Sequence, residues 1–419
     1  MTQHLTAPST IARDLERLYA FDEDLIADPF PLFERMRAEE PVVRVSSVVA
    51  VSRYEDIKTI FKDVATFSNI RATGSRVSDR QRTLDAEDRA KYDYLIEGDR
   101  LHPGQMDGPG HTRMRRFVND IFALKTINAM RDSLTALADE LLDEATADGS
   151  GVFDLSEVSY KLPFIWICRM LAISEVEMEQ FRRWAYEFRL GLGTNYDNLD
   201  AAYEAAIAIE RWVLALIADR RANPGSEADD MISKLIRTEV NGTHLSDREL
   251  VTLFAVMLTT GNTNDMISNA VIALDEHPDQ KQLLLDNPSL MRGAVEEFFR
   301  YCPAAHSVHR VAAADTEIAG FPVQRGETVR LIVASANRDG DKFENPKTLD
   351  VTRANARQHL DLGYGVHTCL GQWLSRLEIE VALSRLYERF PDLHVAGPFS
   401  YRRNYQFHGP EVLMVGTSK

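Results

Sequence analysis

The chain has 419 residues, 44% of them hydrophobic and 27% charged, a composition typical of a folded protein rather than a disordered or fibrous one. Its 64 acidic and 48 basic residues give a formal charge of −16, and no long basic tract could follow a phosphate backbone, which argues against a nucleic-acid partner. The longest uninterrupted apolar run covers only residues 212–218, whereas crossing a bilayer takes roughly 20 residues, so we expect a cytoplasmic protein without a membrane segment.

The chain contains three cysteines, Cys168, Cys302 and Cys369, that are widely separated. They are too few for a disulfide framework and form no C-x-x-C pair of the kind that binds structural zinc. A reducing compartment fits this usage.

The first part of the chain predicts an α+β opening followed by a long loop. Residues 29–67 indicate a helix, two short strands (PVVRV and VVAVS) and a second helix, because the apolar positions of the helical parts recur at spacings of three and four. Residues 69–106 are polar and aperiodic, and a loop of this length in a compact domain is more often a functional lid than an idle connection. Residues 110–283 are helical in pattern nearly throughout.

A long central helix is predicted from its start signal. Ser246 and Glu249 form a capping box before an apolar run, and the helix should continue to about His277. The run is apolar nearly all round before Thr259, which predicts burial. Residues 259–265, TTGNTND, then turn polar and include a glycine, and such a cluster inside a buried helix calls for a packing or functional reason.

The last third of the chain predicts a helix at residues 288–301, followed by strands at 309–311, 317–318 and 328–334, with a turn at Arg325 and Gly326. An irregular stretch at 337–365 leads to a final helix at about residues 370–390. We find no repeat or linker, so we expect one domain over residues 1–419 with a mostly α (α+β) fold.

The most specific pattern is LGYGVHTCLGQWLSR at residues 362–376, in which Gly363 precedes His367 and Cys369, and Gly371 follows. The start of a helix lowers the pKa of a thiol, and glycines allow the backbone to approach a flat ligand. Two other interpretations are a structural cysteine behind a glycine-rich turn and a catalytic nucleophile. The second, a thiol hydrolase, lacks a recognisable His and Asn or Asp partner.

This segment resembles the haem-binding loop of the cytochrome P-450 family, with Cys369 as axial ligand to the iron. Further landmarks of the family follow in the same order. Glu297 and Arg300 match its E-x-x-R motif, and Arg353 lies where a second arginine completes a Glu-Arg-Arg network. Alone, an i, i+3 Glu/Arg pair is usually a solvated helix pair. Together with Cys369, it supports the resemblance.

The resemblance implies one non-covalent haem b, whose buried propionates must be paired with cations. It places His111, Arg115, Arg310 and His367 at the propionates, with Gly363 and Gly371 beside the cofactor. It also implies a helical triangular prism with a small β-rich region and a long central oxygen-binding helix.

The implied activity is a monooxygenase that inserts one atom of O2 into its substrate, because a thiolate ligand favours O–O cleavage. We expect no fused reductase or ferredoxin domain, so that electrons from NAD(P)H arrive through a separate ferredoxin and reductase that dock near Arg115 and Arg116. The alternatives are a haem-binding sensor or carrier without turnover, and a natural-product tailoring oxidase with atypical oxygen activation.

The chain departs from the family in the central helix, where an acid and a threonine usually deliver protons to bound oxygen. Here Thr263 stands at the acid position and Asn264 at the alcohol position, and Asp265 follows. An amide has no titratable proton to give. We expect that Asn264 orders a water or that the substrate assists, rather than that oxygen is activated poorly. The candidate catalytic residues are Thr260, Gly261, Thr263, Asn264 and Asp265.

Two smaller departures are Leu362 for the usual Phe and Ser375 for the usual Ala. The resemblance places the walls of the substrate pocket at residues 71–105, 184–196, 256–264, 305–308 and 405–407. Several of these residues are polar, which predicts a small oxygenated substrate that undergoes hydroxylation or oxidative O-demethylation. The pocket candidates are Val256, Thr260, Asn264, His306, Ser307 and Phe407.

Overall fold

The computed structural model describes residues 9–70, 74–192, 198–223, 231–259 and 262–417. The chain divides into two compact units, each assembled from segments distant in sequence. Unit 1 comprises Met1–Arg76, Ser268–Thr368 and Val395–Leu413, and unit 2 comprises Val77–Ile267, Cys369–His394 and Met414–Lys419. The expectation of a single domain stays a prediction.

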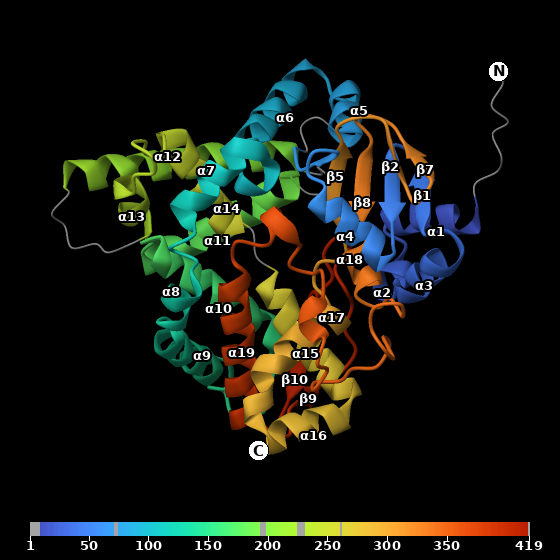
Figure 1. Cartoon of the computed structure of the whole chain (residues 1–419). Helices are drawn as coiled ribbons and strands as arrows, with labels where there is room; N and C mark the ends of the chain where they lie inside the picture. The colour runs from blue at the N-terminus through green and yellow to red at the C-terminus, as the bar shows by residue number, and fades with distance from the viewer. Residues whose placement is uncertain (1–8, 71–73, 193–197, 224–230, 260–261, 418–419) are drawn as a thin grey trace. The chain divides into compact units, whose positions relative to one another are not determined.

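Unit 1 contains a five-stranded sheet with the order β1-β2-β8-β5-β3. Figure 1 labels β1, β2, β8 and β5 of this sheet. β2 and β8 are parallel, whereas the other neighbours are antiparallel. β2 and β8 are buried at every position, as expected for central strands covered on both faces. The strands are β1 (Val42–Val45), β2 (Val48–Val51), β3 (Phe67–Ser68), β5 (Val308–Ala312) and β8 (Thr328–Leu331).

The remaining elements of unit 1 are mostly helical. The strand predicted at 328–334 ends at Leu331, and Val333–Ala336 instead forms the short helix α18. The prediction was wrong because all four residues of α18 are buried, so their apolar run does not distinguish strand from helix. The other elements are α1 (Thr10–Tyr19), α2 (Glu23–Ala27), α3 (Phe30–Glu39), α4 (Tyr54–Lys62), α16 (Pro278–Asp286), η3 (Pro288–Leu290), α17 (Met291–Tyr301), η4 (Ala356–Gln358), η5 (Gly365–His367) and the hairpin of β6 (Thr316–Ile318) and β7 (Phe321–Val323).

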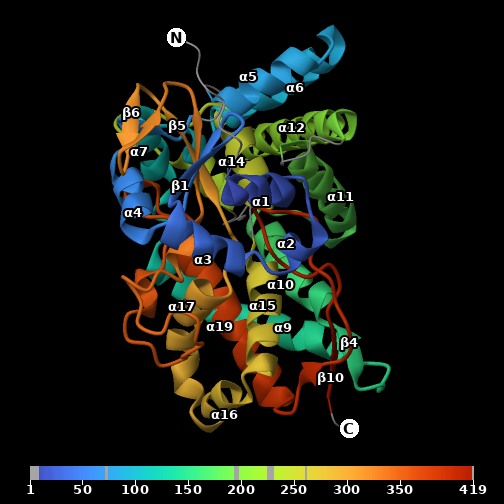
Figure 2. The ribbon, with the colours of Figure 1, turned by 90° about the vertical axis from the view of Figure 1, so that its right-hand side faces the viewer.

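Unit 2 is built almost entirely of helices. α19 (Gln372–Arg389) packs against α9 and α10, and α11 lies beside α12 (Figure 2). One short antiparallel pair joins β4 (Val152–Asp154) to β10 (Met414–Gly416). The helices are α6 (Ala86–Asp99), η2 (Pro103–Gln105), α7 (Gly108–Val118), α8 (Leu124–Asn128), α9 (Arg131–Ala145), α10 (Leu155–Met170), α11 (Glu175–Leu192), α12 (Leu199–Ala222), α13 (Met231–Arg237) and α14 (Asp247–Thr259). Three elements span the division between the units, namely α5 (Ser75–Thr83), α15 (Thr263–Glu276) and β9 (His394–Val395).

The prediction of a loop at residues 69–106 is wrong, because α5, α6 and η2 occupy most of this range. Asp85 caps α6 by accepting a hydrogen bond from the amide of Asp88, at 2.9 Å. Tyr92, Leu95 and Ile96 are buried on one face at helical spacing. These three apolar residues are surrounded in the sequence by charged ones, so the helical periodicity is too short to recognise from the sequence.

The central helix is described as two helices, α14 and α15, with Asn262 outside both. The predicted capping box is present, since Glu249 Oε2 accepts from the Ser246 amide at 2.8 Å and Ser246 Oγ accepts from the Glu249 amide at 3.3 Å. The Asn262 carbonyl accepts from the Met266 amide at 3.0 Å, which starts α15. Thr260 and Gly261 lie outside the described residues.

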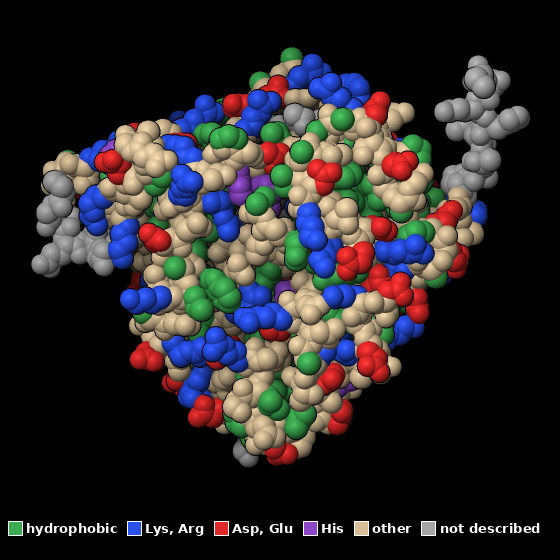
Figure 3. All heavy atoms as spheres, in the orientation of Figure 1, with side chains coloured by type: hydrophobic (Ala, Val, Ile, Leu, Met, Phe, Trp, Pro, Cys, Tyr) green, Lys and Arg blue, Asp and Glu red, His purple; other side chains and the backbone are tan. Residues whose placement is uncertain are grey.

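The predicted fold class, mostly helical with a small β-rich part, is confirmed. Within the part of the chain that the structure describes, no helix has the length and apolar character needed to span a bilayer. Figure 3 shows acidic and basic side chains intermingled over the face that it draws.

Candidate thiolate site

Cys369 lies in unit 2, two residues before Gly371, the N-cap of α19, and its carbonyl accepts a hydrogen bond from the amide of Gln372, the first residue of that helix, at 3.3 Å. Its side chain is exposed, whereas Cys168 is buried. Burial raises the pKa of Cys168 to about 12, which keeps that thiol protonated. The partial positive charge at the start of an 18-residue helix stabilises a thiolate. Cys369 is therefore the cysteine suited to bind a metal.

A cation on α7 accompanies this thiol in the same unit. Burial lowers the pKa of Arg115, and the negative charge of Cys369 opposes that shift, so the guanidinium lies within electrostatic reach of the sulfur. His111 is buried one helical turn earlier, and Arg116 is exposed. The arrangement suits an anionic ligand atom or cofactor group.

The loop before Cys369 requires glycine at Gly363. Its φ is +73°, and a Cβ there would lie 3.3 Å from the carbonyl oxygen of His367. At Gly371, by contrast, such a Cβ would meet no atom within 4 Å among the described residues, apart from its own neighbours in the chain. An exposed thiol with open space beside a glycine at the helix start fits a flat, thiolate-ligated group such as haem.

Arg310 belongs to β5 in unit 1 and is 6% exposed. It donates to the carbonyl of His309 at 2.7 Å, and its guanidinium lies 4.9 Å from the centre of the Phe61 ring. His367, also in unit 1, is the last residue of the short helix η5.

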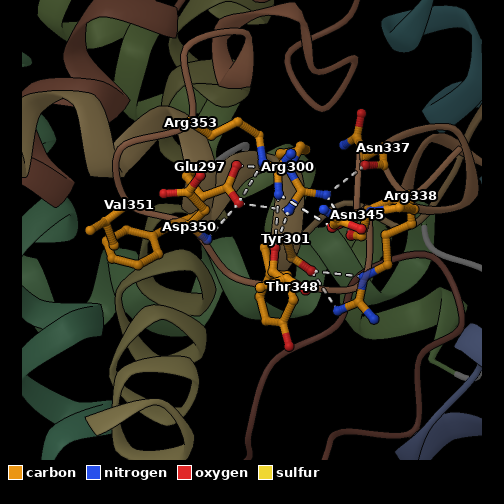
Figure 4. Close-up of polar contacts among 12 residues, drawn as sticks. Glu297, Arg300, Tyr301, Asn337, Arg338, Asn345, Thr348, Asp350, Val351 and Arg353 are labelled. Atoms are coloured by element: carbon orange, nitrogen blue, oxygen red, sulfur yellow. Dashed lines mark hydrogen bonds and ion pairs between the residues drawn. The ribbon is translucent and has the colours of Figure 1, made fainter. Parts of the chain in front are cut away.

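The three charged residues matched to the Glu-Arg-Arg network meet inside unit 1 (Figure 4). Glu297 and Arg300 are fully buried on α17 and form two hydrogen bonds of 2.6 and 2.7 Å. Arg353 donates to Glu297 from the following irregular segment at 3.1 Å, and the Asp350 amide donates at 3.0 Å. Arg300 also donates to the carbonyls of Asn337, Pro346 and Thr348.

These bonds give the network a structural role. Three backbone carbonyls of the segment after β8 are held by one guanidinium, and the acid that neutralises it is held in turn by Arg353. The network therefore fastens this irregular segment to α17.

The polar start of α15 is largely buried in unit 2. Asn264 Nδ2 donates to Asp265 Oδ1 at 2.7 Å, and Asp265 is 2% exposed. Thr263 is also buried, and its hydroxyl donates to Ser375 Oγ at 3.2 Å. The two residues that replace the usual acid and the usual Ala of the family are thus in contact.

Sequence reasoning missed Glu378, which is 4% exposed on α19. Burial raises the pKa of this carboxyl to about 8, and a hydrogen bond with Thr263 partly opposes the shift. Glu378 therefore holds a proton at neutral pH. No local pattern reveals it, because a charged residue in a helix is usually solvated and only the packing of α19 shows that this one is buried.

The pocket candidates differ in their surroundings. Val256 is half-buried on α14, and Phe407 pairs with Ala305 in an isolated bridge in unit 1. Ser307 is buried and accepts a hydrogen bond from Arg330 at 3.1 Å. The ring of His306 is buried, stacks on His408 and meets the rings of Phe30 and Phe33 in T-shaped contacts.

Known proteins similar to this chain were found by sequence and by structure. The family model described as Cytochrome P450 matches residues 271–395. Cytochrome P450 107B1 of Saccharopolyspora erythraea is 33% identical over 387 residues, 90% of this chain and 92% of that protein. The 6-deoxyerythronolide B hydroxylase of the same organism is 35% identical over 319 residues, 74% of this chain and 77% of that protein.

A solved structure of the cytochrome P450 PksS from Bacillus subtilis superposes with a TM-score of 0.84 at 29% identity, covering 95% of this chain and 99% of that one. The identity and coverage together exceed what a shared fold alone would give. The chain therefore belongs to the cytochrome P450 family and is a monooxygenase.

Proposed function

We propose that this monooxygenase binds haem b through Cys369 and oxidises a small, oxygenated organic substrate by hydroxylation or oxidative O-demethylation. The observation that carries the proposal is the exposure of the cysteines. Cys369 is exposed at a helix start beside the cation of Arg115, whereas Cys168 is buried and Cys302 is partly buried. Bound haem would supply the activation of O2 at its iron. A haem sensor without turnover is disfavoured, because relatives over most of the chain are named hydroxylases.

We assign the anionic groups of the cofactor to basic side chains. In unit 2 these are His111 and Arg115, and in unit 1 they are Arg310 and His367. The burial of His111 and Arg310 supports this assignment, since an acceptor for its N–H groups stabilises a buried imidazole or guanidinium.

Protons are proposed to reach the reaction from residues of α15 and α19. Glu378 holds a proton at neutral pH, and the Thr263 hydroxyl in contact with it can accept that proton and donate another. Asn264 is held by Asp265, which fixes the direction of its amide. In this proposal Asn264 orients a water or a substrate group, and the titratable proton comes from a carboxyl nearby.

Electrons are proposed to come from NAD(P)H through a separate ferredoxin and reductase in the cytoplasm. The exposed Arg116 and its neighbour Arg115 on α7 give an acidic ferredoxin a basic contact in unit 2. A titration of the chain with an acidic ferredoxin at rising ionic strength would measure this contact.

The axial ligand is tested by spectroscopy of the purified protein. Reduction under CO should give the absorption band from which the family takes its name, and Cys369→Ser should abolish it while Cys168→Ser keeps it. A Cys369→Ser protein that retained the band would contradict the assignment of the ligand.

A further inference from the structure

Two hydroxyl groups and one carboxyl group of unit 2 meet where the start of α15 contacts α19. Ser375 and Glu378 lie three residues apart on α19 and therefore on one face of that helix. Thr263, the first residue of α15, contacts both, with 3.2 Å between its Oγ1 and Ser375 Oγ and a side-chain hydrogen bond with Glu378. Thr263 and Glu378 are 6% and 4% exposed, so these bonds are largely shielded from solvent.

Counting hydrogens shows that the two bonds of Thr263 are coupled. A hydroxyl has one hydrogen to donate and two lone pairs with which to accept. If Thr263 donates to Ser375, its bond with Glu378 requires a hydrogen on the carboxyl group, which Thr263 then accepts. If Thr263 donates to Glu378 instead, the carboxyl can be ionised and Ser375 must donate to Thr263. The direction of the bond between the two hydroxyls therefore decides whether an ionised Glu378 has a donor.

The surroundings of Glu378 favour its neutral form. Leu374 and Val381, one helical turn away on either side of it, are buried apolar residues. Burial raises the pKa of Glu378 to about 8, and the hydrogen bond with Thr263 is the one contact that opposes this shift. No charged side chain of the described residues contributes to it.

The titratable groups of the elements around α19 are engaged elsewhere or exposed. α19 packs against α8, α9 and α10. Lys125 of α8 is exposed, Cys168 of α10 is a buried neutral thiol, and Asp265 of α15 accepts a hydrogen bond from the preceding side chain. The ion pairs of α9, α10 and α19 include Arg131 with Glu380, Asp139 with Arg385, Asp143 with Arg389, Lys161 with Glu144 and Arg169 with Glu140. Burial and one hydroxyl contact therefore govern the proton of Glu378.

We propose that Ser375 is a positioning residue, which accepts the single hydrogen of the Thr263 hydroxyl and so leaves the Thr263 oxygen to accept from a neutral Glu378. The hydrogen of Ser375 itself stays available for the backbone carbonyl four residues earlier, the acceptor that a serine inside a helix commonly uses. Glu378 stores a proton in the proposed function, on which this inference rests, and Ser375 regulates that store. An alanine at position 375 would remove the acceptor that competes with the carboxylate for the hydrogen of Thr263.

The test measures the protonation of Glu378 directly, without turnover. Infrared spectra of the haem-loaded protein at a series of pH values separate the carbonyl stretch of a neutral carboxyl from that of a carboxylate. Subtracting the spectrum of Glu378→Gln, made in each variant background, isolates this residue. The wild-type pKa should be about 8. Ser375→Ala should raise the acid dissociation constant about tenfold, because the freed Thr263 hydroxyl then donates to the carboxylate.

Two further variants separate positioning from packing. Ser375→Thr keeps the hydroxyl and should keep the wild-type pKa of Glu378. In a Thr263→Val background, Ser375→Ala should leave that pKa unchanged, because Ser375 acts through the Thr263 hydroxyl. The matched control is Thr252→Ala, which removes another buried hydroxyl of unit 2, one that donates to the carbonyl of Arg248 at 3.0 Å. The control should also keep the wild-type pKa.

The direction of the change in Ser375→Ala decides the matter. A raised pKa of Glu378 would mean that Ser375 donates to Thr263 rather than accepting from it, and an unchanged pKa would mean that Ser375 has no influence; both results overturn the proposal. It is also overturned if the pKa falls equally in Ser375→Thr or in Thr252→Ala, or if Ser375→Ala lowers it as much when Thr263 is valine.

Two measurements separate this inference from the function on which it rests. All variants should show the family's CO band, because none of them alters Cys369, and a wild-type protein without the band contradicts the proposed haem function alone. The second measurement is product formed per NAD(P)H consumed as a function of pH. In Ser375→Ala the yield should decline at a lower pH than in the wild type. If the pKa of Glu378 falls and this decline does not move, Ser375 still positions Thr263, but Glu378 is not the proton source of turnover.

Discussion

At the scale of single residues, the departures from the family pattern explain one another. Thr263 replaces an acid and contacts Ser375, which replaces an alanine, and Thr263 also contacts the buried carboxyl of Glu378. A carboxyl group is thus present beside position 263 on the neighbouring helix. Asn264 completes the set through its bond to Asp265.

Substitutions of Asn264 test its role as an orienting group. Asn264→Ala removes the donor to Asp265 and should raise peroxide release at the expense of product. Asn264→Thr replaces the amide by a hydroxyl that can also donate, and it should leave the yield broadly intact. The measurement is product formed per NAD(P)H consumed. If Asp265→Asn stopped turnover and Asn264→Ala changed nothing, the proton source would be Asp265.

At the scale of elements, α17 and the irregular segment after α18 depend on one buried network. Arg300→Ala should leave the carboxylate of Glu297 without its closest partner. Because this carboxylate is fully buried, the change should lower the free energy of unfolding by roughly 3–5 kcal/mol. The expected result is a low yield of haem-loaded protein, measured as the ratio of haem to protein absorbance.

The matched control for this prediction is Lys347→Ala, which breaks an exposed ion pair with Glu34 in the same unit. Solvent screens such a pair, so haem content should stay as in the wild type. Normal haem content in the Arg300→Ala protein would mean that the network is dispensable.

At the scale of the whole molecule, two kinds of buried group make stability depend on pH in opposite directions. The pKa of Glu378 is raised from 4.5 to about 8, so the folded state binds the extra proton. The stabilisation is fully present below pH 4.5 and is lost as pH rises through about 8. The free energy of unfolding should therefore fall between pH 5 and 8 with a slope of at most about 1.4 kcal/mol per pH unit. Glu378→Gln should remove this pH dependence, as measured by urea unfolding.

The two stacked imidazoles of unit 1, His306 and His408, make the stability of the protein depend on pH in the acidic range. Burial lowers the pKa of His408 from 6.5 to about 4, opposed by its hydrogen bond with the carbonyl of Ile26. Burial also lowers the pKa of His306, which stacks on His408 at 4.4 Å. Both rings are neutral in the folded state, so stability is present above pH 6.5 and falls as pH drops toward 4. Histidine-selective NMR should find neither ring titrating near 6.5, and a midpoint there would contradict the burial argument.

The sequence by itself determined the chemistry that depends on local spacing. The glycine-flanked Cys369, the Glu297 and Arg300 pair one helical turn apart, and the capping box at Ser246 are all encoded within a few residues. Such patterns constrain the backbone directly, so the thiolate loop, the final helix and the family could be inferred without the fold.

Only the tertiary structure decided which polar groups are buried and what they touch. Three contacts illustrate this: Glu378 with Thr263, Thr263 with Ser375, and Arg330 with Ser307 and Tyr405 each join residues far apart in the chain. A side chain's pKa and its need for a partner depend on its solvent exposure and its neighbours, and both are set by packing rather than by local sequence. The same reason explains why the prediction of a loop at 69–106 was wrong. The buried face of α6 is recognisable only from the elements that cover it.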